Sequence, residues 1–249
     1  MQFKNEINES RITRNNNLLL KFMIFILCVF LPDLAFPTGA CCVIGKGNAN
    51  KFALSLSASM AKNHENINDE IYDLSQYAFL LKLNYPVIKN ITFQVQAGFP
   101  ISTSLENQNK ESFRGKSGWN IGISAGYLLP EVVNDFELFL AAGYAVTKSF
   151  LNKEKGREFV NKEMKVSEFQ AVLIGEYKVI NDLFLFTGLR IYGSKIELKE
   201  ELNSKSGSHL GSLGYFFGLR YSMSEKFDLA LESSFGHTNL GGIGLIFYL

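Results

Sequence analysis

Charged residues that recur inside apolar, alternating segments are the first candidates for chemistry. Arg190 and Glu232 each stand near the middle of such a segment, on the face that otherwise carries small and polar side chains. Opposite charges in a confined interior are stabilised by pairing. We therefore expect Arg190 and Glu232 to form an ion pair across that interior, the alternative being that each is hydrated separately. Further charged residues fall on the same face, namely Lys82, Glu137, Glu168, Glu176, Arg220 and Asp228.

Large apolar side chains interrupt this polar face near one end of the segments. A group of them at one level would fill the interior and oppose a wide column of water, because small barrels have little internal room and aqueous channels need about 16 strands. We predict that these residues plug the interior: Phe139, Phe184, Phe186, Phe216, Ile246 and Tyr248.

Nucleophile, base and metal-ligand chemistry has little support in the sequence. Among the 3 histidines, His64 and His209 fall in stretches that we interpret as loops, where hydrated side chains are the norm. The 3 cysteines are Cys28 and the adjacent Cys41 and Cys42, which offer neither a disulfide framework nor a metal-ligand spacing. We expect no catalytic residue, no metal site and no cofactor.

Ten segments of about nine residues that alternate apolar with small or polar side chains would position these residues. Strict alternation indicates strands, and 9 to 11 residues suit a tilted strand that crosses a membrane. We expect ten strands, or eight if the weaker first and ninth segments fail to span. The segments are Phe52 to Met60, Tyr77 to Tyr85, Ile91 to Phe99, Trp119 to Tyr127, Phe136 to Val146, Phe169 to Tyr177, Leu183 to Ile191, Leu213 to Tyr221, Phe227 to Phe235 and Gly242 to Leu249.

The connections between the segments alternate in length. Those after even segments are short and contain turn residues, whereas most of those after odd segments are long and charged. Transmembrane barrels have tight periplasmic turns and longer outer loops. We therefore predict four long outer loops, at Ala61 to Gln76, Pro100 to Gly118, Lys148 to Glu168 and Gly193 to Gly211.

The apolar face is bracketed by aromatic residues, as in Tyr77 with Tyr85, which is typical of a surface that meets lipid at two interfaces. A strand edge inside hydrocarbon cannot be satisfied by water, so the last strand must pair with the first. We predict an all-β, up-and-down antiparallel transmembrane β-barrel at residues 52–249. A soluble lipocalin-like barrel or a sandwich is the alternative.

The first 40 residues are typical of an export signal. Basic residues precede the ten-residue apolar run from Phe22 to Leu31, which is too short to span a membrane as a helix, and small residues follow up to Ala40. Residues 41–51 would form a short periplasmic arm, and Cys41 would be lipidated if the chain is instead a lipoprotein. Without the leader the basic and acidic residues balance, so we expect no nucleic-acid partner.

The C-terminus resembles the signal by which outer-membrane β-barrel proteins are recognised for assembly, through Gly244, Phe247 and Leu249. It departs from that pattern in Gly242, where a polar residue is favoured, and in the final Leu249 in place of Phe. Residues 52–249 as a whole resemble the OmpA-like or OmpX-like, porin-related class of small barrels. The resemblance implies a monomer in the outer membrane that contacts lipid and lipopolysaccharide and is inserted by the barrel-assembly machinery.

Three functions remain open. The first is a structural or surface-contact role with at most a narrow pore, the second a small-solute or ion channel, and the third a lipid A-modifying enzyme. The Asp-x-His element of omptin proteases is absent, and His237-Thr238-Asn239 is only distantly similar to the His-x-Ser-Asn element of lipid A deacylases. We therefore expect no enzyme, and we expect the charged outer loops to provide solubility or contact with lipopolysaccharide.

Overall fold

The computed structural model describes residues 51–68, 70–108, 111–129, 136–155, 158–200, 203–236 and 238–249. All of them belong to one compact unit, Ala35–Leu249. The predicted export signal at 1–40, Cys41 and the arm up to residue 50 lie outside the described residues. Within the described part of the chain, no helix combines the length and the hydropathy needed to cross a membrane.

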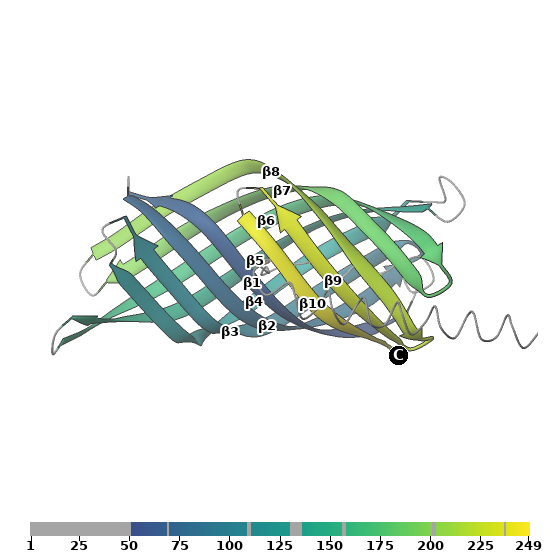
Figure 1. The fold of residues 1–249 in the computed structure, drawn as a ribbon, viewed down its shortest axis with the longest axis horizontal. Coiled ribbons are helices and arrows are strands. Elements are labelled where there is room, and N and C mark those ends of the chain that lie inside the picture. Colours follow the sequence, from purple (N-terminus) through teal and green to yellow (C-terminus); the bar gives the residue numbers. More distant parts are fainter. Residues whose placement is uncertain are drawn as a thin grey trace, which may run out of the picture. The chain divides into compact units, whose positions relative to one another are not determined.

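Ten antiparallel strands form one closed barrel, in which each strand pairs with its neighbours in sequence (Figure 1). This confirms the ten-strand prediction. The strands are β1 (Ala53–Ile67), β2 (Glu70–Ile88), β3 (Ile91–Asn107), β4 (Ser112–Leu128), β5 (Phe136–Lys155), β6 (Glu158–Ile180), β7 (Leu183–Glu200), β8 (Asn203–Ser224), β9 (Phe227–Phe235) and β10 (Thr238–Tyr248).

The barrel closes between its first and last strands. β1 pairs with β10 from Ala53 opposite Tyr248 to Asn63 opposite Thr238. The backbone N–H of Leu249 then donates to the carbonyl oxygen of Phe52 at 2.9 Å. The closure predicted for the C-terminal strand is therefore confirmed, and this seam leaves no open sheet edge along its length.

The prediction of four long outer loops is wrong. Strands β5 to β8 contain 20, 23, 18 and 22 residues, about twice what a membrane crossing needs, so most of the expected loop residues belong to strands. The alternation of inward and outward side chains continues beyond the lipid-facing stretch, and this lets the strands extend. We call the end with the C-terminus the lower end and the end with these extensions the upper end.

The β9–β10 hairpin is shorter than its neighbours, with strands of 9 and 11 residues (Figure 1). Above the hairpin, β1 and β8 come together directly. The backbone N–H of Ser206 donates to Asn68 Oδ1 at 3.3 Å, and a Cβ added to Gly207 would lie 2.1 Å from the carbonyl oxygen of Asn66. The barrel wall therefore contains ten strands below this level and eight above it.

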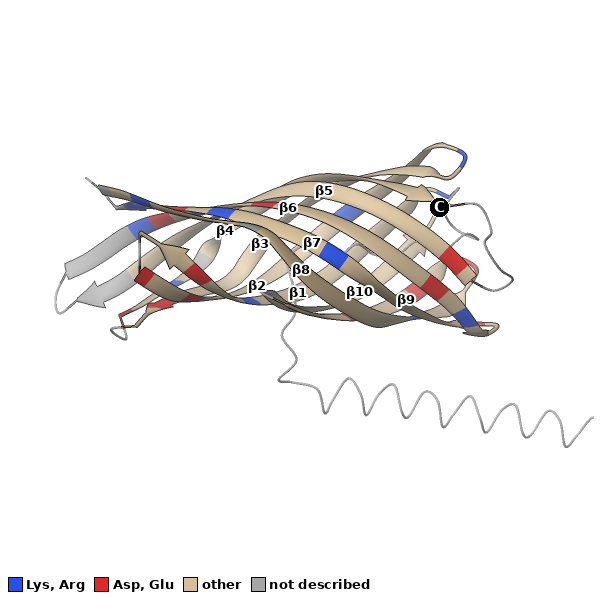
Figure 2. Cartoon of the chain, turned by 90° about the horizontal axis from the view of Figure 1, so that it is seen from above, with Lys and Arg blue, Asp and Glu red and all other residues tan. Residues whose placement is uncertain are grey.

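Outward side chains form an apolar band around the barrel. Tyr77, Tyr85, Trp119 and Tyr127 are all more than 40% exposed, at the edges predicted for them, with Leu and Ile between. Charged residues gather toward the two ends of the molecule (Figure 2). An apolar band bordered by aromatic residues is the exterior of a barrel that spans a membrane.

Candidate functional site

The interior of the barrel is layered, and β7 passes through every layer. Its inward residues, from the lower end upward, are Phe184, Phe186, Gly188, Arg190, Tyr192, Ser194, Ile196 and Leu198. Aromatic, charged, polar and aliphatic side chains thus follow one another along a single strand. Since neighbouring strands contribute the same kinds of residue at matching heights, the lumen is filled by distinct layers rather than lined by one surface.

A lower apolar cluster fills the lumen toward the C-terminal end. Five of the six predicted plug residues are buried in it, namely Phe139, Phe186, Phe216, Ile246 and Tyr248. Each phenyl ring of the cluster lies over a glycine of a neighbouring strand, because a Cβ added to Gly126, Gly188 or Gly218 would fall within 2.8 Å of Phe139, Phe216 or Phe186 respectively. These glycines make room in a narrow lumen for three large rings. The cluster also contains Ala53, Leu128, Val172, Ile174 and Ala230.

A buried charge network lies at the lower end. Arg220 donates from Nε to Glu176 Oε2 at 3.1 Å and from Nη2 to Oε1 at 2.5 Å, which is a two-pronged contact. Its Nη1 donates to Asp228 Oδ2 at 2.7 Å, and the Tyr248 hydroxyl donates to the same oxygen at 2.7 Å. The guanidinium carbon lies 4.0 Å from the ring centre of Phe184, which therefore supports the network instead of joining the cluster.

Sequence reasoning placed Arg220, Glu176 and Asp228 inside the barrel but did not connect them. Their distances along the chain from the nearest turn could have connected them, since each of the three residues lies within four residues of a short lower turn. Residues at equal distance from turns at one end of a barrel lie at similar heights. All three side chains are at least 95% buried, and a buried charge requires a partner.

Arg190 and Glu232, the predicted ion pair, both point into the lumen. They lie on β7 and β9, opposite two glycines of the intervening strand, Gly214 and Gly218. Two cations, Lys82 and Arg190, interact electrostatically with the Glu232 carboxyl group. Direct contact between Arg190 and Glu232 stays a prediction, and Lys82 is a second cation near Glu232 that the sequence analysis did not pair with it.

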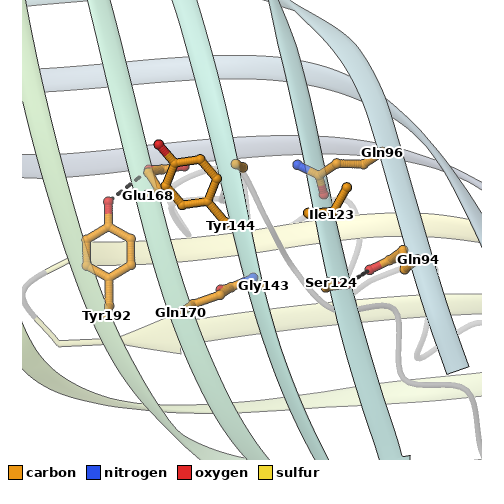
Figure 3. A pocket seen from close by; sticks show the side chains of 10 residues that line it. Gln94, Gln96, Ile123, Ser124, Gly143, Tyr144, Glu168, Gln170 and Tyr192 are labelled. Atoms are coloured by element: carbon orange, nitrogen blue, oxygen red, sulfur yellow. Dashed lines mark hydrogen bonds between the residues drawn. The ribbon is translucent and has the colours of Figure 1, made fainter. Parts of the chain in front are cut away.

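A polar layer occupies the middle of the barrel. Gln96 donates to Asn120 at 2.9 Å, and Asn120 donates to Thr147 at 2.7 Å, which links β3, β4 and β5. Beside them, the Tyr192 hydroxyl donates to Glu168 and the Ser124 hydroxyl to Gln94, both at 2.8 Å (Figure 3). A cavity lined by residues that include Gln94, Gln96, Ser124, Glu168 and Tyr192 has a volume of about 20 Å³, which is enough for about one water molecule.

An upper apolar cluster fills the lumen of the extended part. Its members are buried inward residues of strand segments that we had assigned to loops, where apolar and polar residues still alternate. That continued alternation was the available signal, and the charged residues on the outer face concealed it. The cluster contains Ile67, Tyr72, Leu74, Leu105, Phe113, Leu151, Met164, Val166, Ile196 and Leu198.

His209, which we had assigned to a loop, lies in β8. Its Nε2 is hydrogen-bonded to the hydroxyl of Ser212. Glu65 of β1 is buried nearby and accepts hydrogen bonds from Asn63 and Ser194, both at 3.3 Å. Burial raises the pKa of Glu65, whereas these hydrogen bonds and the charge of His209 lower it in part. His64 lies on the exposed face of β1, and His237 lies outside the described residues.

Lysines gather on the outer wall just above the aromatic edge formed by Tyr144 and Phe169. Lys148 and Lys165 are directly opposite each other, and Lys195 and Lys199 follow on β7. Two acids lie among them, since Lys148 contacts Glu163 at 2.9 Å and Lys195 contacts Glu197 at 2.8 Å. The hydrogen bond and charge of Lys195 lower the pKa of Glu197, so Glu197 stays ionised at neutral pH. Four lysines against two glutamates leave this patch positive.

Below the lysine patch, the lipid-facing wall is hollowed by a groove of about 660 Å³. Its floor is a row of paired small residues, Ala125, Ala142 and Ala171, on β4, β5 and β6. A parallel row of larger side chains forms one wall, from Tyr127 through Leu140 and Leu173 to Leu189. The groove is apolar throughout and therefore suits a hydrocarbon chain.

Of the residues in the predicted assembly signal, Gly244 points inward on β10, whereas Phe247 points outward. Leu249, 78% exposed, follows the end of the strand. Their role in assembly stays a prediction.

Comparisons with known proteins identify the fold. No protein-family model matches the chain, and no curated protein matches it by sequence. Among solved structures, the translocator domain of autotransporter NalP from Neisseria meningitidis aligns with a TM-score of 0.50 at 11% identity, covering 80% of this chain and 88% of that one. The outer membrane protease OmpT from Escherichia coli aligns with a TM-score of 0.53 at 8% identity, covering 81% and 98%.

Both solved structures are barrels of the bacterial outer membrane, and at these identities the likeness concerns the fold alone. The closed ring of ten strands and the apolar exterior are also those of a barrel that spans a membrane. By its fold, this chain is a small outer-membrane β-barrel.

Proposed function

We propose that the protein is an integral outer-membrane barrel that does not conduct and that acts through its surface. One observation carries the proposal: every level of the barrel contains inward side chains that are fully buried. Arg220, Lys82 and Arg190 in the lower and middle layers are no more than 5% exposed, and Gln76 and Leu105 higher up are 3% and 0% exposed. A continuous water channel would expose such groups, whereas here protein atoms cover them.

Planar-bilayer recording tests the closed lumen. We expect the folded full-length protein to give no stable current steps under conditions in which a general porin, added as a positive control, conducts. A variant with Phe139→Ala, Phe216→Ala, Leu105→Ala and Leu151→Ala removes bulk from both apolar clusters and should show current. Stable current steps from the unmodified protein would favour the narrow ion channel, our second candidate from sequence.

We propose further that the surface partner is an anionic lipid of the outer leaflet, in keeping with the lipopolysaccharide contact expected from sequence. The lysine patch supplies positive charge at the height of lipid head groups, and the groove below it suits an acyl chain. A lipid molecule carries a phosphate and a hydrocarbon chain in this same order. Positive charge that meets phosphate adds to the apolar contact.

Thermal unfolding in detergent tests the lipid contact. Added lipopolysaccharide should raise the unfolding temperature of the unmodified protein, because a ligand that binds only the folded state stabilises it. Lys165→Ala with Lys195→Ala should lose most of this shift, whereas the control pair Lys89→Ala with Lys226→Ala, at exposed lower turns, should keep it. An equal shift in both double variants would exclude the patch as the binding surface.

A further inference from the structure

A serine, a histidine and a buried glutamate meet in the upper lumen, above the β9–β10 hairpin. His209 and Ser212 are only three residues apart on β8, yet both point inward. The ladder between β7 and β8 shifts register there, since Tyr192 is opposite Ser212 and Ser194 is opposite His209. Leu210 and Gly211 therefore stand against Gly193 alone, which is a β-bulge. Bulges often re-aim a side chain beside an active site.

The imidazole and the hydroxyl are arranged as a base and its nucleophile. Nε2 of His209 is hydrogen-bonded to Oγ of Ser212, so the imidazole is placed to accept the hydroxyl proton. Such a base needs an acidic partner that orients the imidazole ring and stabilises the imidazolium that forms when the ring takes up the proton.

Glu65 fills the place of that acidic partner. It is 3% exposed, and its carboxylate accepts a hydrogen bond at 3.3 Å from Ser194, the residue directly opposite His209. The charge of His209 also acts on the Glu65 carboxyl group, so the two groups interact electrostatically. The direct approach of β1 to β8 above the short hairpin is what brings Glu65 here.

The bulge places an exposed glycine directly before Ser212 in the chain. Gly211 has a φ of +82°, which favours glycine, and a Cβ built on it would have no atom within 4 Å apart from those of its two chain neighbours. Ser212 and His209 are half-buried, and Gly211 is exposed.

We propose that Ser212, His209 and Glu65 form a hydrolytic site for carboxylic esters of small size. His209 Nε2 removes the hydroxyl proton as Ser212 Oγ bonds to the ester carbonyl carbon. The tetrahedral intermediate expels the alcohol, which takes the proton from His209, and leaves an acyl-serine. Water then attacks that ester with the same proton transfers and releases the carboxylic acid. Glu65 is a positioning residue, and this site is independent of whether the lumen conducts.

Labelling of the folded full-length protein with a fluorophosphonate tests the nucleophile. Ser212 Oγ should displace fluoride, and peptide mass spectrometry should find the adduct on Ser212. His209→Ala should slow labelling at least about a hundredfold, the usual share of a general base, while Ser208→Ala, an exposed serine on the same strand, should label at the normal rate. Heat-modifiable gel mobility checks that each variant is folded.

Hydrolysis of p-nitrophenyl butyrate tests turnover. Ser212→Ala and His209→Ala should each lower the rate at least about a hundredfold. Glu65→Gln should lower it as well, and Glu65→Asp should restore part of it, which a purely structural role would not require. The proposal is overturned if Ser212 is not labelled, if His209→Ala labels at the normal rate, or if labelling occurs without ester turnover.

Discussion

At the scale of single residues, Arg220 shows how a charged side chain is accommodated deep in a membrane barrel. Its guanidinium group donates hydrogen bonds to the carboxylates of Asp228 and Glu176, and the flat face of the group lies against the ring of Phe184. A buried ion pair is not by itself strong evidence of stability, because its desolvation offsets much of the attraction. Removing one partner is different, since it leaves an uncompensated buried charge.

We therefore expect Arg220→Met to lower the free energy of unfolding by about 3 to 5 kcal/mol, measured by denaturant titration in detergent micelles. Arg114→Met, on the exposed face of β4, is the matched control and should change stability little. Adding Glu176→Gln and Asp228→Asn to Arg220→Met should recover much of the loss. If the two arginine variants are equally stable, the network does not support the fold.

At the scale of elements, the lower apolar cluster depends on pairs of residues on neighbouring strands. Phe139 lies over Gly126, whose added Cβ would come within 2.1 Å of the ring and meet no other side chain or backbone at such short range. An aromatic side chain that covers a cross-strand glycine compensates for the weak strand preference of glycine. The pair thus fills the lumen and holds β4 to β5.

Gly126→Val should destabilise the barrel by about 1 to 3 kcal/mol, because the added methyl groups overpack the site. In a Phe139→Ala background the same substitution should cost much less, since the ring that it meets is gone. A double-mutant cycle from unfolding titrations measures this coupling. Independent effects of the two substitutions would contradict the contact.

At the scale of the whole molecule, the sequence predicted the strands better than their lengths. Alternation from Phe52 onward identified all ten strands, because lipid on one side and a narrow lumen on the other demand opposite residue types at every second position. The same rule gave a wrong prediction at the upper end. Lys195, Glu197 and Lys199 face water there, and we interpreted this charged stretch as a loop. Between them, Ile196 and Leu198 continue the inward pattern into the upper apolar cluster.

The interior contacts were less predictable than the strands. The alternation of side chains decides which residues face inward, so eight inward charged residues were identified, although Glu65 lay in a stretch that we had interpreted as a loop. Contact between inward residues also depends on the register between strands. Glu65 and His209 are 144 positions apart, and only the short β9–β10 hairpin brings β1 against β8. A bulge then decides that His209 and Ser212 share a face. Neither the hairpin's height nor the bulge has a clear signal in a single sequence.

Cross-linking across the seam between β1 and β10 tests the closed barrel most directly. With the three native cysteines replaced by serine, we introduce Ser57→Cys with Gly244→Cys and, separately, Leu56→Cys with Leu245→Cys, two directly opposed pairs on the inner and outer faces. Directly opposed pairs in an antiparallel ladder alternate between a wider and a closer spacing. One of these two neighbouring pairs therefore has the closer spacing, so at least one pair should form a disulfide in isolated membranes. In the control variant, Leu56→Cys with Gly244→Cys, the two cysteines lie on opposite faces of the sheet and should not form a disulfide. Absence of a disulfide in both opposed pairs, or equal cross-linking in all three, would contradict the closed ten-stranded barrel.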